Sequence, residues 1–424
     1  MTDTRPIRQP ANDRSAELPV GPRPAVPPMP DDLARWASAD AVARPVRLAR
    51  LRERMAQEAV DVYFGVSREN TRYLTGFVLA EGEEKVAGDS GRFLVSPAEV
   101  VVLVDSRYRG QAEEECRGLR IEESYYDLPD RWEAIVRSLR AADGRPVRRV
   151  AVEATLVSHA LWQALQAAAP DVELVAAGSW VEELRAVKEP AEIERIAAAC
   201  AVADEALTRL LPSIRPGVTE HDLALQLEWE MRTHGAEALA FDVTCLSGPR
   251  AALPHGSPGD RPVTAGGVLL FDFGAQVAGY RSDMTRTLFV GEPSRRELEL
   301  YRLVAVSQEA AFRALAEAAS EHDAPTGVSV DAAARDVIAA AGHGDHFGHG
   351  LGHGIGLATH EMPSLSRRAL PAPLPWPTVF SIEPGIYLPG ETGIRIEDLV
   401  VFDPGSDTLE RLTGFPREVT VVGS

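Results

Sequence analysis

Cysteine is scarce in this sequence, which has only three in 424 residues. Cys116, Cys200 and Cys245 are widely spaced and odd in number, so neither a disulfide framework nor a zinc site built from thiolates is expected. Long hydrophobic runs are absent too, because no apolar stretch reaches the roughly 18 residues that a transmembrane helix needs. The N-terminus also lacks the apolar segment of a secretory signal. We therefore expect a cytoplasmic protein with no membrane partner.

Basic residues are fewer than acidic residues in this sequence. Lysine and arginine together number 44 against 63 aspartates and glutamates, which gives a formal net charge of −19 at pH 7. Binding to DNA or RNA needs basic patches that neutralise phosphates, so we expect no nucleic acid partner. The remaining composition, 45% hydrophobic and 25% charged, is that of an ordinary soluble globular protein.

The length of the chain predicts two domains. Residues 1–45 are expected to form an N-terminal arm that is partly disordered, because residues 1–30 are rich in proline and polar side chains. A first domain is expected at 46–183, where strand-like runs alternate with helical patterns, as in an α/β fold. The expected strands are 60–66, 100–105, 147–153 and 172–178, and the expected helices are 47–59, 130–142 and 158–169.

The second domain, 184–424, combines long helices with hairpin strands, which predicts an α+β fold. Its first helix is expected at 184–211, with Pro190 in the first turn, where a missing N–H has little effect. Further helices are expected near 219–234, 295–319 and 329–341, and the pairs Thr219/Asp222 and Ser294/Glu297 look like capping boxes. After residue 264 the strands are separated by glycine-rich turns.

Two aspartates of the second domain stand in strand-like runs, where a charge is out of place. Asp272 and Asp283 flank the turn "AQVAG" and lie at equal distances from the midpoint between Val277 and Ala278. A simple hairpin would set them directly opposite each other, with Cβ atoms roughly 4.5–5.5 Å apart. Two carboxylates that close repel each other unless a cation lies between them or one is protonated.

A second pair of acids repeats this arrangement, because Glu383 and Glu397 are equidistant from Gly390 in the turn "LPGETG". Solvated strand ends would explain either pair alone. Both pairs together with a nearby imidazole favour a site for two divalent cations, whose charge balances four carboxylates. Oxygen-rich ligation with one nitrogen suits manganese, cobalt, iron or zinc. Two such ions can activate a water and polarise a carbonyl, which is hydrolase chemistry.

The acids and the histidine, taken in order, resemble the ligand set of the pita-bread metallopeptidases, which include methionine aminopeptidase, Xaa-Pro aminopeptidase and Xaa-Pro dipeptidase (prolidase). Four stretches of the sequence resemble the proline-specific branch of this family: "DFGAQVAGYRSDMTRT", "GHGIGLATHE", "SIEPGIYLPGETGIRIED" and "LTGFPRE". Four further stretches resemble the creatinase-like N-terminal domain and the linker helix of that branch: "RLARLRERM", "NTRYLTGF", "VDSRY" and "VKEPAEIERI". The resemblance covers roughly 46–420. It implies an α/β creatinase-like N-terminal domain and an α+β pita-bread catalytic domain.

The resemblance also implies a role for each site residue. The metal ligands would be Asp272, Asp283, His353, Glu383 and Glu397. Asp283 and Glu397 would bridge two ions, Asp272 would bind one of them, and His353 and Glu383 the other. Glu383 would also relay a proton. The substrate's scissile carbonyl would be held by His255 and His360, which would stabilise the charge that develops on its oxygen. His349 and Arg395 would bind the substrate, His349 by shaping the pocket, and Arg395 would also support Glu397.

The stretch "HFGHGLGHGIGLATHE" (346–361) holds four histidines, of which only His353 would bind metal. His349 lies four residues earlier, so an extended strand would point both side chains the same way. His360 lies seven residues later, an odd offset, and can reach the site only if the chain bends at Gly354 or Gly356. His346 is expected to be a loop residue without a role.

The function implied is that of a dinuclear-metal exopeptidase that hydrolyses the Xaa-Pro imide bond of dipeptides or short peptides. Attack by a metal-bridging hydroxide would break the bond. The cofactors would be two divalent metal ions, with manganese as the first expectation and cobalt, zinc or iron as alternatives. The family commonly forms homodimers, so a homodimer is expected here.

Several alternatives stay open at this point. Creatinase shares the fold but lacks the metal ligands, so the five ligands present here disfavour a creatinase activity. Relatives that retain metal also act on small non-peptide amides such as ectoine, and some eukaryotic relatives are non-catalytic binding proteins. Dipeptidase and aminopeptidase activity cannot be separated from the sequence, because they differ in whether the cleft captures the C-terminal carboxylate of a dipeptide.

Overall fold

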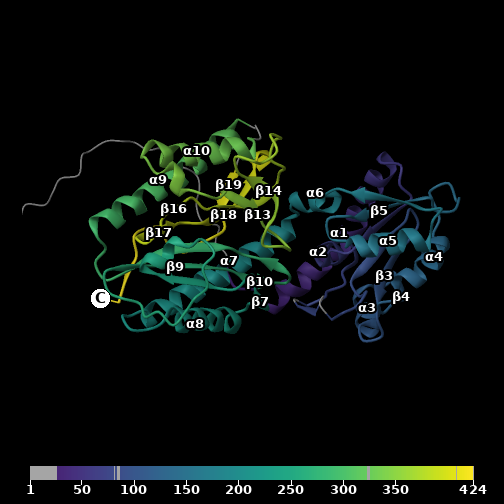
Figure 1. The fold of residues 1–424 in the computed structure, drawn as a ribbon, viewed down its shortest axis with the longest axis horizontal. Helices are drawn as coiled ribbons and strands as arrows, with labels where there is room; N and C mark the ends of the chain where they lie inside the picture. The colour runs from purple at the N-terminus through teal and green to yellow at the C-terminus, as the bar shows by residue number, and fades with distance from the viewer. Residues whose placement is uncertain (1–25, 81, 84–85, 322–324, 407, 424) are drawn as a thin grey trace, which may run out of the picture.

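The structure is a computed structural model that describes residues 26–80, 82–83, 86–321, 325–406 and 408–423. The chain forms two parts that lie side by side, the N-terminal part at the right of Figure 1 and the C-terminal part at the left. Most of the arm expected to be disordered lies outside the described residues. Within the described ranges, no helix is both long enough and apolar enough to cross a membrane.

The N-terminal part is built on one six-stranded sheet with the strand order β4-β3-β2-β1-β5-β6. The strands are β1 (Val62–Gly65), β2 (Arg92–Val95), β3 (Val100–Val104), β4 (Arg120–Glu123), β5 (Arg149–Glu153) and β6 (Glu173–Ala177). β2 runs antiparallel to both of its neighbours, whereas the other neighbouring pairs are parallel. All four strands expected in this part are present, and β2 and β4 have no counterpart among the expected strands.

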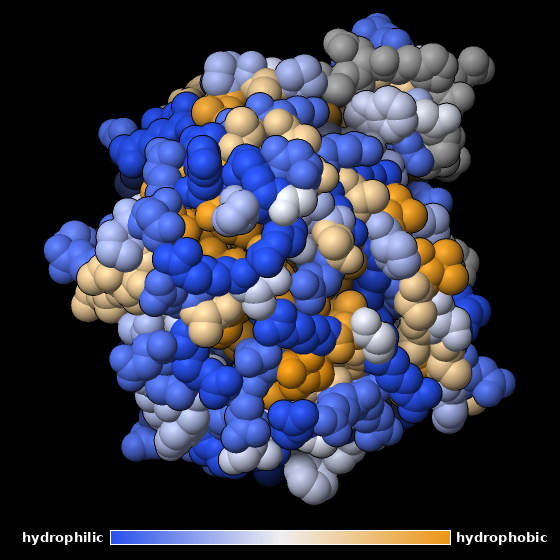
Figure 2. Space-filling model, turned by 90° about the vertical axis from the view of Figure 1, so that its right-hand side faces the viewer, coloured by the Kyte–Doolittle hydropathy of each residue, from blue (hydrophilic) through white to orange (hydrophobic). Residues whose placement is uncertain are grey.

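Helices cover this sheet because its central strands, such as β1 and β3, are buried on both faces. All five residues of β3, which reads VVVLV, are buried. The helices are α2 (Arg68–Thr75), α3 (Arg109–Glu115), α4 (Leu128–Ser138), α5 (His159–Ala168) and α6 (Trp180–Ala186). Trp132 of α4 packs edge-on against Phe64 of β1, with ring centroids 5.1 Å apart. The outer surface at this end of the molecule is mainly hydrophilic, with small apolar patches (Figure 2).

Helix α1 (Pro30–Gln57) joins the two parts and begins well before the expected start of the first domain at residue 46. The last third of the expected arm is therefore helical. Trp36 is 3% exposed and belongs to the core formed by α7 (Pro190–Leu210) and α8 (Glu220–Thr233). Arg47, which is 2% exposed, forms an ion pair with Glu189 just before α7 at 2.7 Å. These contacts fix α1 against the C-terminal part.

The C-terminal part contains α7 and α8 together with α9 (Arg295–Ser320) and α10 (Gly327–Ala340), close to the expected helices. The helix expected at 184–211 is divided, because residues 184–186 belong to α6 and α7 begins at Pro190. Ser294 and Glu297 form the expected capping box of α9, and Thr219 accepts a hydrogen bond from the Asp222 amide at the start of α8. Helices α8 and α9 therefore begin where the sequence places their caps.

The strands of the C-terminal part form two larger sheets and short ribbons. The strands are β7 (Ala238–Leu239), β8 (Thr244–Ser247), β9 (Gly267–Phe273), β10 (Ala275–Val277), β11 (Tyr280–Arg281), β12 (Met284–Val290), β13 (Gly352–Gly354), β14 (Glu361–Leu365), β15 (Thr378–Ile382), β16 (Gly385–Leu388), β17 (Thr392–Arg395), β18 (Asp398–Asp403), β19 (Thr408–Arg411) and β20 (Val421–Val422). One sheet has the order β20-β12-β9-β8 and the other β14-β13-β15-β18-β19. β16 pairs with β17, and β10 pairs with β7 and β11.

The register expected for the first acidic hairpin is wrong by two residues. Asp272 pairs with Thr285, not with Asp283. The turn is a tight two-residue turn at Ala278 and Gly279, which both have positive φ (47° and 86°), as favoured hairpin turns require. This turn moves the midpoint one residue along the chain. An offset of two residues keeps both aspartates on the same face, so the carboxylates lie diagonally to each other.

The register expected for the second ribbon is confirmed. Gly385 pairs with Arg395 on one side of the two glutamates, and Ile382 pairs with Asp398 on the other. Glu383 and Glu397 lie between these pairs, in the short breaks that separate β15 from β16 and β17 from β18. Both pairs have the symmetry about Gly390 that the sequence predicts, so the two glutamates face each other across the ribbon.

Candidate metal centre

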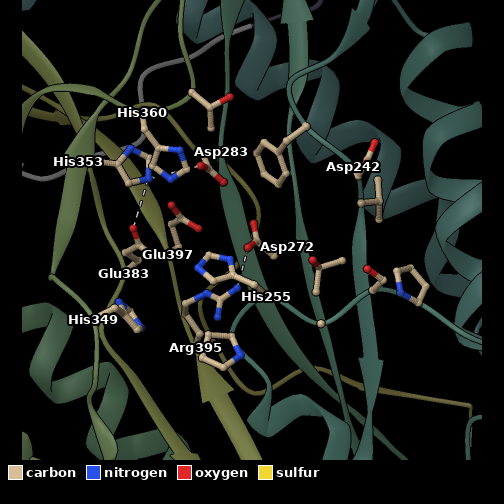
Figure 3. A pocket seen from close by; sticks show the side chains of 18 of the residues that line it. Asp242, His255, Asp272, Asp283, His349, His353, His360, Glu383, Arg395 and Glu397 are labelled. Atoms are coloured by element: carbon tan, nitrogen blue, oxygen red, sulfur yellow. Dashed lines mark hydrogen bonds and ion pairs between the residues drawn. The ribbon is translucent and has the colours of Figure 1, made fainter. Parts of the chain in front are cut away.

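Five side chains with metal-binding atoms converge on one cavity of about 680 Å³ (Figure 3). They are the residues expected as ligands, namely Asp272, Asp283, His353, Glu383 and Glu397. Asp272 is in β9 and Asp283 directly precedes β12, whereas His353 is in β13 of the other sheet. The ribbon supplies the two glutamates. The fold thus brings together residues that are up to 125 positions apart in the chain.

The orientation of His353 leaves one ring nitrogen free to bind a cation. Its Nδ1 lies 3.1 Å from the carbonyl oxygen of Gly354, which can only accept, so the neutral ring carries its proton on Nδ1. The lone pair of Nε2 then points toward carboxylates, with Glu383 Oε1 at 3.3 Å and Asp283 Oδ2 at 3.7 Å. A lone pair that faces two carboxylates is repelled by them unless a cation lies between.

The carboxylates have the same requirement. Asp272 Oδ1, Asp283 Oδ1 and Glu397 Oε1 are buried without a hydrogen-bond partner within the described part of the chain. Burial, and then the charges of neighbouring acids, raise the pKa of Asp283 and of Glu397 well above the usual range. Ligand atoms of Asp283, His353 and Glu397 all lie within 4.8 Å of one another. Unpaired buried carboxylates are costly, so this donor set fits divalent cations.

Arg395 lies beside these acids and contacts a different partner from the one expected. Its guanidinium forms an ion pair with Asp272 at 2.7 Å and donates to Thr285 Oγ1 at 2.8 Å. The expected support of Glu397 is indirect: the charge of Arg395 acts to lower the pKa of Glu397, while its hydrogen bonds go to other residues. The hydrogen bonds reach Glu397 through Thr285, whose hydroxyl donates to Glu397 Oε2 at 2.8 Å. The third donor of Arg395 is directed to Tyr387, so the whole guanidinium is engaged by the protein.

His349 lines the cavity, but both of its ring nitrogens are already bonded. Nδ1 donates to the carbonyl oxygen of Gly350 at 2.7 Å, so Nε2 accepts the hydroxyl proton of Tyr387 at 2.8 Å. Tyr387 in turn accepts from Arg395 at 2.7 Å. This chain of hydrogen bonds makes His349 a fixed part of the wall. Tyr387 is not among the expected site residues, although the ribbon register that the sequence predicts places it diagonally across from Arg395.

His360 reaches the site through the bend expected from its odd offset. The pairing of β13 with β14 shifts register between His353 and Gly354, and the two imidazole rings come within 4.1 Å between centroids. A Cβ at Gly354 would overlap the carbonyl of Met362, so only glycine allows this close return of the chain. Burial lowers the pKa of His360 to about 4, which keeps the ring neutral at pH 7. His255 is exposed and lies in the same cavity (Figure 3).

A buried ion cluster holds the loop that carries His360. Glu361 accepts a hydrogen bond from Lys188 Nζ at 2.8 Å and also pairs with Arg185 of α6. The three side chains are at most 5% exposed. Burial opposes the charge of Glu361, but the two cations keep its pKa below the usual value. Lys188 and Arg185 precede Glu361 by 173 and 176 positions in the chain, and sequence patterns do not reveal contacts over such separations.

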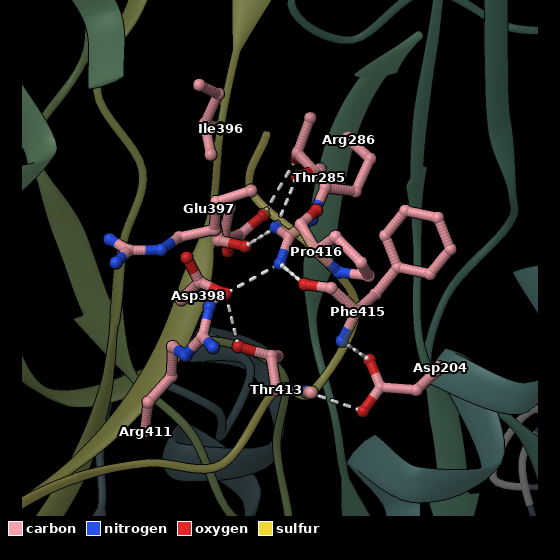
Figure 4. Close-up of polar contacts among 12 residues, drawn as sticks. Asp204, Thr285, Arg286, Ile396, Glu397, Asp398, Arg411, Thr413, Phe415 and Pro416 are labelled. Atoms are coloured by element: carbon pink, nitrogen blue, oxygen red, sulfur yellow. Dashed lines mark hydrogen bonds and ion pairs between the residues drawn. The ribbon is translucent and has the colours of Figure 1, made fainter. Parts of the chain in front are cut away.

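A second buried cluster lies behind Glu397 (Figure 4). Arg286, which is 1% exposed, pairs with Asp398 at 2.7 Å and donates to the backbone carbonyls of Thr285, Glu397, Phe415 and Pro416. Asp398 also accepts from Gln308 at 2.9 Å and from Thr413. The pair therefore ties β12, which begins directly after Asp283, to the segment that carries Glu397. It fixes the spacing of the two acids expected to bridge the ions.

Comparison with known proteins identifies both parts of the chain. Residues 194–404 match metallopeptidase family M24, and residues 47–187 match the creatinase/prolidase N-terminal domain. An uncharacterized peptidase of Bacillus subtilis, YqhT, is 36% identical over 380 residues, which cover 89% of this chain and all of that protein.

Solved structures of similar proteins have the same architecture. The Xaa-Pro dipeptidase from Bacillus anthracis superposes with a TM-score of 0.79 at 32% identity over 89% of this chain and all of its own. The X-Pro aminopeptidase from Thermotoga maritima superposes with a TM-score of 0.77 at 35% identity over 88% of this chain and 99% of its own. The resemblance found in the sequence and the fold that it implies are confirmed.

Proposed function

This chain belongs to metallopeptidase family M24, and from that premise we propose that it hydrolyses the Xaa-Pro imide bond of dipeptides or short peptides. The observation that carries the proposal is the convergence of four acids and His353 Nε2, where three carboxylate oxygens have no hydrogen-bond partner among the residues that the structure describes. The proteins whose structures are similar are a dipeptidase and an aminopeptidase for Xaa-Pro bonds.

Two divalent metal ions are proposed as cofactors, with manganese as the first candidate. They would be held by Asp272, Asp283, His353, Glu383 and Glu397. Bound there, they supply the chemistry of lowering the pKa of water and polarising a carbonyl. Arg395 keeps Asp272 oriented toward the cavity, and Thr285 does the same for Glu397.

The remaining steps belong to side chains of the cavity. His360 and His255 donate hydrogen bonds to the oxygen of the scissile carbonyl as charge develops on it. The nitrogen of the Xaa-Pro bond bears no hydrogen, so proline can leave as an amine only after it gains a proton. Glu383 takes a proton from the attacking water and passes it to this nitrogen. The hydroxyl of Ser381, 3.1 Å from Glu383 Oε1, orients the carboxylate for that transfer.

A panel of small substrates tests the proposal. With manganese, cobalt or zinc added, we expect cleavage of Gly-Pro-Gly at a kcat/KM at least about a hundredfold above that for Gly-Ala-Gly. Ectoine serves as the non-peptide substrate in the same assay. Hydrolysis of ectoine without cleavage of any Xaa-Pro peptide would replace the proposal by the amidohydrolase alternative.

Removal of metal is expected to make stability depend on pH. Asp283 and Glu397 have raised pKa values in the folded chain, so the metal-free protein is stabilised below their unfolded values and loses that stability as the pH rises through the folded ones. Metal binding reverses this loss and adds about 3 kcal/mol at a hundredfold excess over Kd. The Tm difference between manganese-loaded and chelator-treated protein should therefore widen from pH 5 to pH 8.

An internal control for this experiment comes from Asp204, which lies outside the cavity and whose pKa burial raises to about 6. Its titration lowers the stability of both forms alike and cancels in the difference. A Tm difference that is constant across this pH range would contradict the assignment of the buried acids to a metal site.

We also propose that the domains divide near residue 183, that the enzyme is cytoplasmic and that it forms a homodimer. The two family matches, which end at 187 and begin at 194, support a division in this region. Analytical ultracentrifugation of the purified protein measures the oligomeric state.

A further inference from the structure

The described residues that line the cavity offer no lysine or arginine that is free of a protein partner. Arg395 is the one lysine or arginine that lines the cavity among the residues that the structure describes. It is 3% exposed, and its three donor nitrogens are directed to Asp272, Tyr387 and Thr285. The chain has only two lysines, of which Lys188 is buried against Glu361. Arg367 and Arg368 follow the cavity residue Ser366, but they are exposed and do not line the wall.

Negative charge is present on the wall away from the metal ligands. Asp242, which follows β7, and Glu228 of α8 both line the cavity. Figure 3 shows Asp242 on the opposite side of the view from His353 and His360. Burial raises the pKa of Glu228. The charge of Arg232, which does not line the cavity, and that of His221 oppose this effect, whereas the charge of Asp242 adds to it, so the two acids lie close enough to interact. This wall attracts an ammonium group and repels a carboxylate.

The position of a substrate carboxylate depends on peptide length. In a free Xaa-Pro dipeptide the proline carboxylate lies directly beyond the scissile bond and must enter the cavity with the proline. In a peptide of three or more residues the same position is a neutral amide, and the carboxylate lies further out. A carboxylate taken from water without a cationic partner loses free energy.

From these observations we propose that the enzyme selects peptides of three or more residues and discriminates against free Xaa-Pro dipeptides. The cavity thus acts as that of an Xaa-Pro aminopeptidase. This inference rests on the proposed Xaa-Pro peptidase function and adds the substrate class.

Three substrates that share one scissile bond test the inference: Ala-Pro, Ala-Pro-NH2 and Ala-Pro-Ala. Ala-Pro-NH2 has the size of the dipeptide but lacks its negative charge. We expect kcat/KM for Ala-Pro-NH2 and for Ala-Pro-Ala to exceed that for Ala-Pro by about tenfold or more. Inhibition constants of L-proline and L-prolinamide give a second readout that involves no turnover, and prolinamide should bind more tightly.

A cation introduced into the wall should reverse the preference. Ser364 lies in β14, pairs with His353 in the ladder, lines the cavity and is exposed. Ser364→Arg should raise the ratio of kcat/KM for Ala-Pro to that for Ala-Pro-NH2 by about tenfold. Ser364→Gln adds a long side chain without charge and should leave this ratio where it is in the wild type.

The outcomes separate the two proposals. Cleavage of Ala-Pro as fast as Ala-Pro-NH2 by the wild type would overturn the length selection and leave the Xaa-Pro function standing, since a cation must then reach the cavity from elsewhere. A ratio that rises equally in Ser364→Arg and Ser364→Gln would also overturn it. If the enzyme cleaves none of the three substrates, the proposed function itself is overturned.

Discussion

Replacing Asp283 by asparagine should lower kcat at least about a thousandfold and reduce the amount of bound metal. The substitution keeps the size of the side chain and removes the charge at the centre of the acid cluster. Asp283 Oδ1 has no hydrogen-bond partner among the described residues, and Oδ2 lies 3.7 Å from His353 Nε2. An amide nitrogen in either position offers no electron pair to a cation. Steady-state kinetics and elemental analysis of the purified variant measure both effects.

Unfolding is separated from loss of metal by the stability of the metal-free variant. Asp283 is held close to other buried acids, so removing its charge relieves repulsion, and chelator-treated Asp283→Asn should melt no lower than chelator-treated wild type at pH 8. Asp260→Asn, which changes an exposed aspartate outside the cavity, should retain activity and metal. An Asp283→Asn enzyme with full activity and a full complement of metal would refute the assignment.

The second large effect is expected on stability, from Asp398→Asn. Asp398 is fully buried and pairs with Arg286, which is 1% exposed and also hydrogen-bonds four backbone carbonyls. The substitution leaves a buried guanidinium without its main counter-charge, which costs about 3–5 kcal/mol. A fall in Tm of about 10 °C is expected from differential scanning calorimetry.

A surface ion pair provides the matched control for this measurement. Glu299 pairs with Arg295 on α9 at 2.9 Å, and their side chains are 58% and 93% exposed. Exposed ion pairs of this kind contribute little to the free energy of unfolding, so Glu299→Gln should leave Tm unchanged. Equal Tm values for Asp398→Asn and Glu299→Gln would show that the cluster behind Glu397 does not hold the two sheets together.

The two acidic ribbons show how far local sequence rules reach. The second register follows from symmetry about Gly390, which occupies its turn with φ of 78°. The register expected for the first ribbon is wrong because Ala278 occupies its turn with φ of 47°, and alanine seldom adopts a positive φ. Alternation of side chains still places both aspartates on the cavity face, so the candidate ligands survive an error in pairing.

Contacts between distant segments lie beyond such rules. The partner of Arg395 depends on how the β16–β17 ribbon packs against β9, and a same-strand argument selects Glu397 where the structure has Asp272. The strands β2 and β4 are short and β4 is polar, so neither gives a strong periodic signal. The core of the N-terminal sheet, by contrast, follows from valine-rich runs such as 100–104.

The ion cluster around Glu361 has a consequence for the division of the molecule. A polypeptide that began at residue 189 would keep every candidate metal ligand and both free imidazoles of the cavity. It would lose Arg185 and Lys188, however, and leave the Glu361 carboxylate next to His360 with neither counter-ion. The segment before α7 therefore supplies the counter-charges of a carboxylate next to His360, and we expect the C-terminal part alone to be less active than the whole chain.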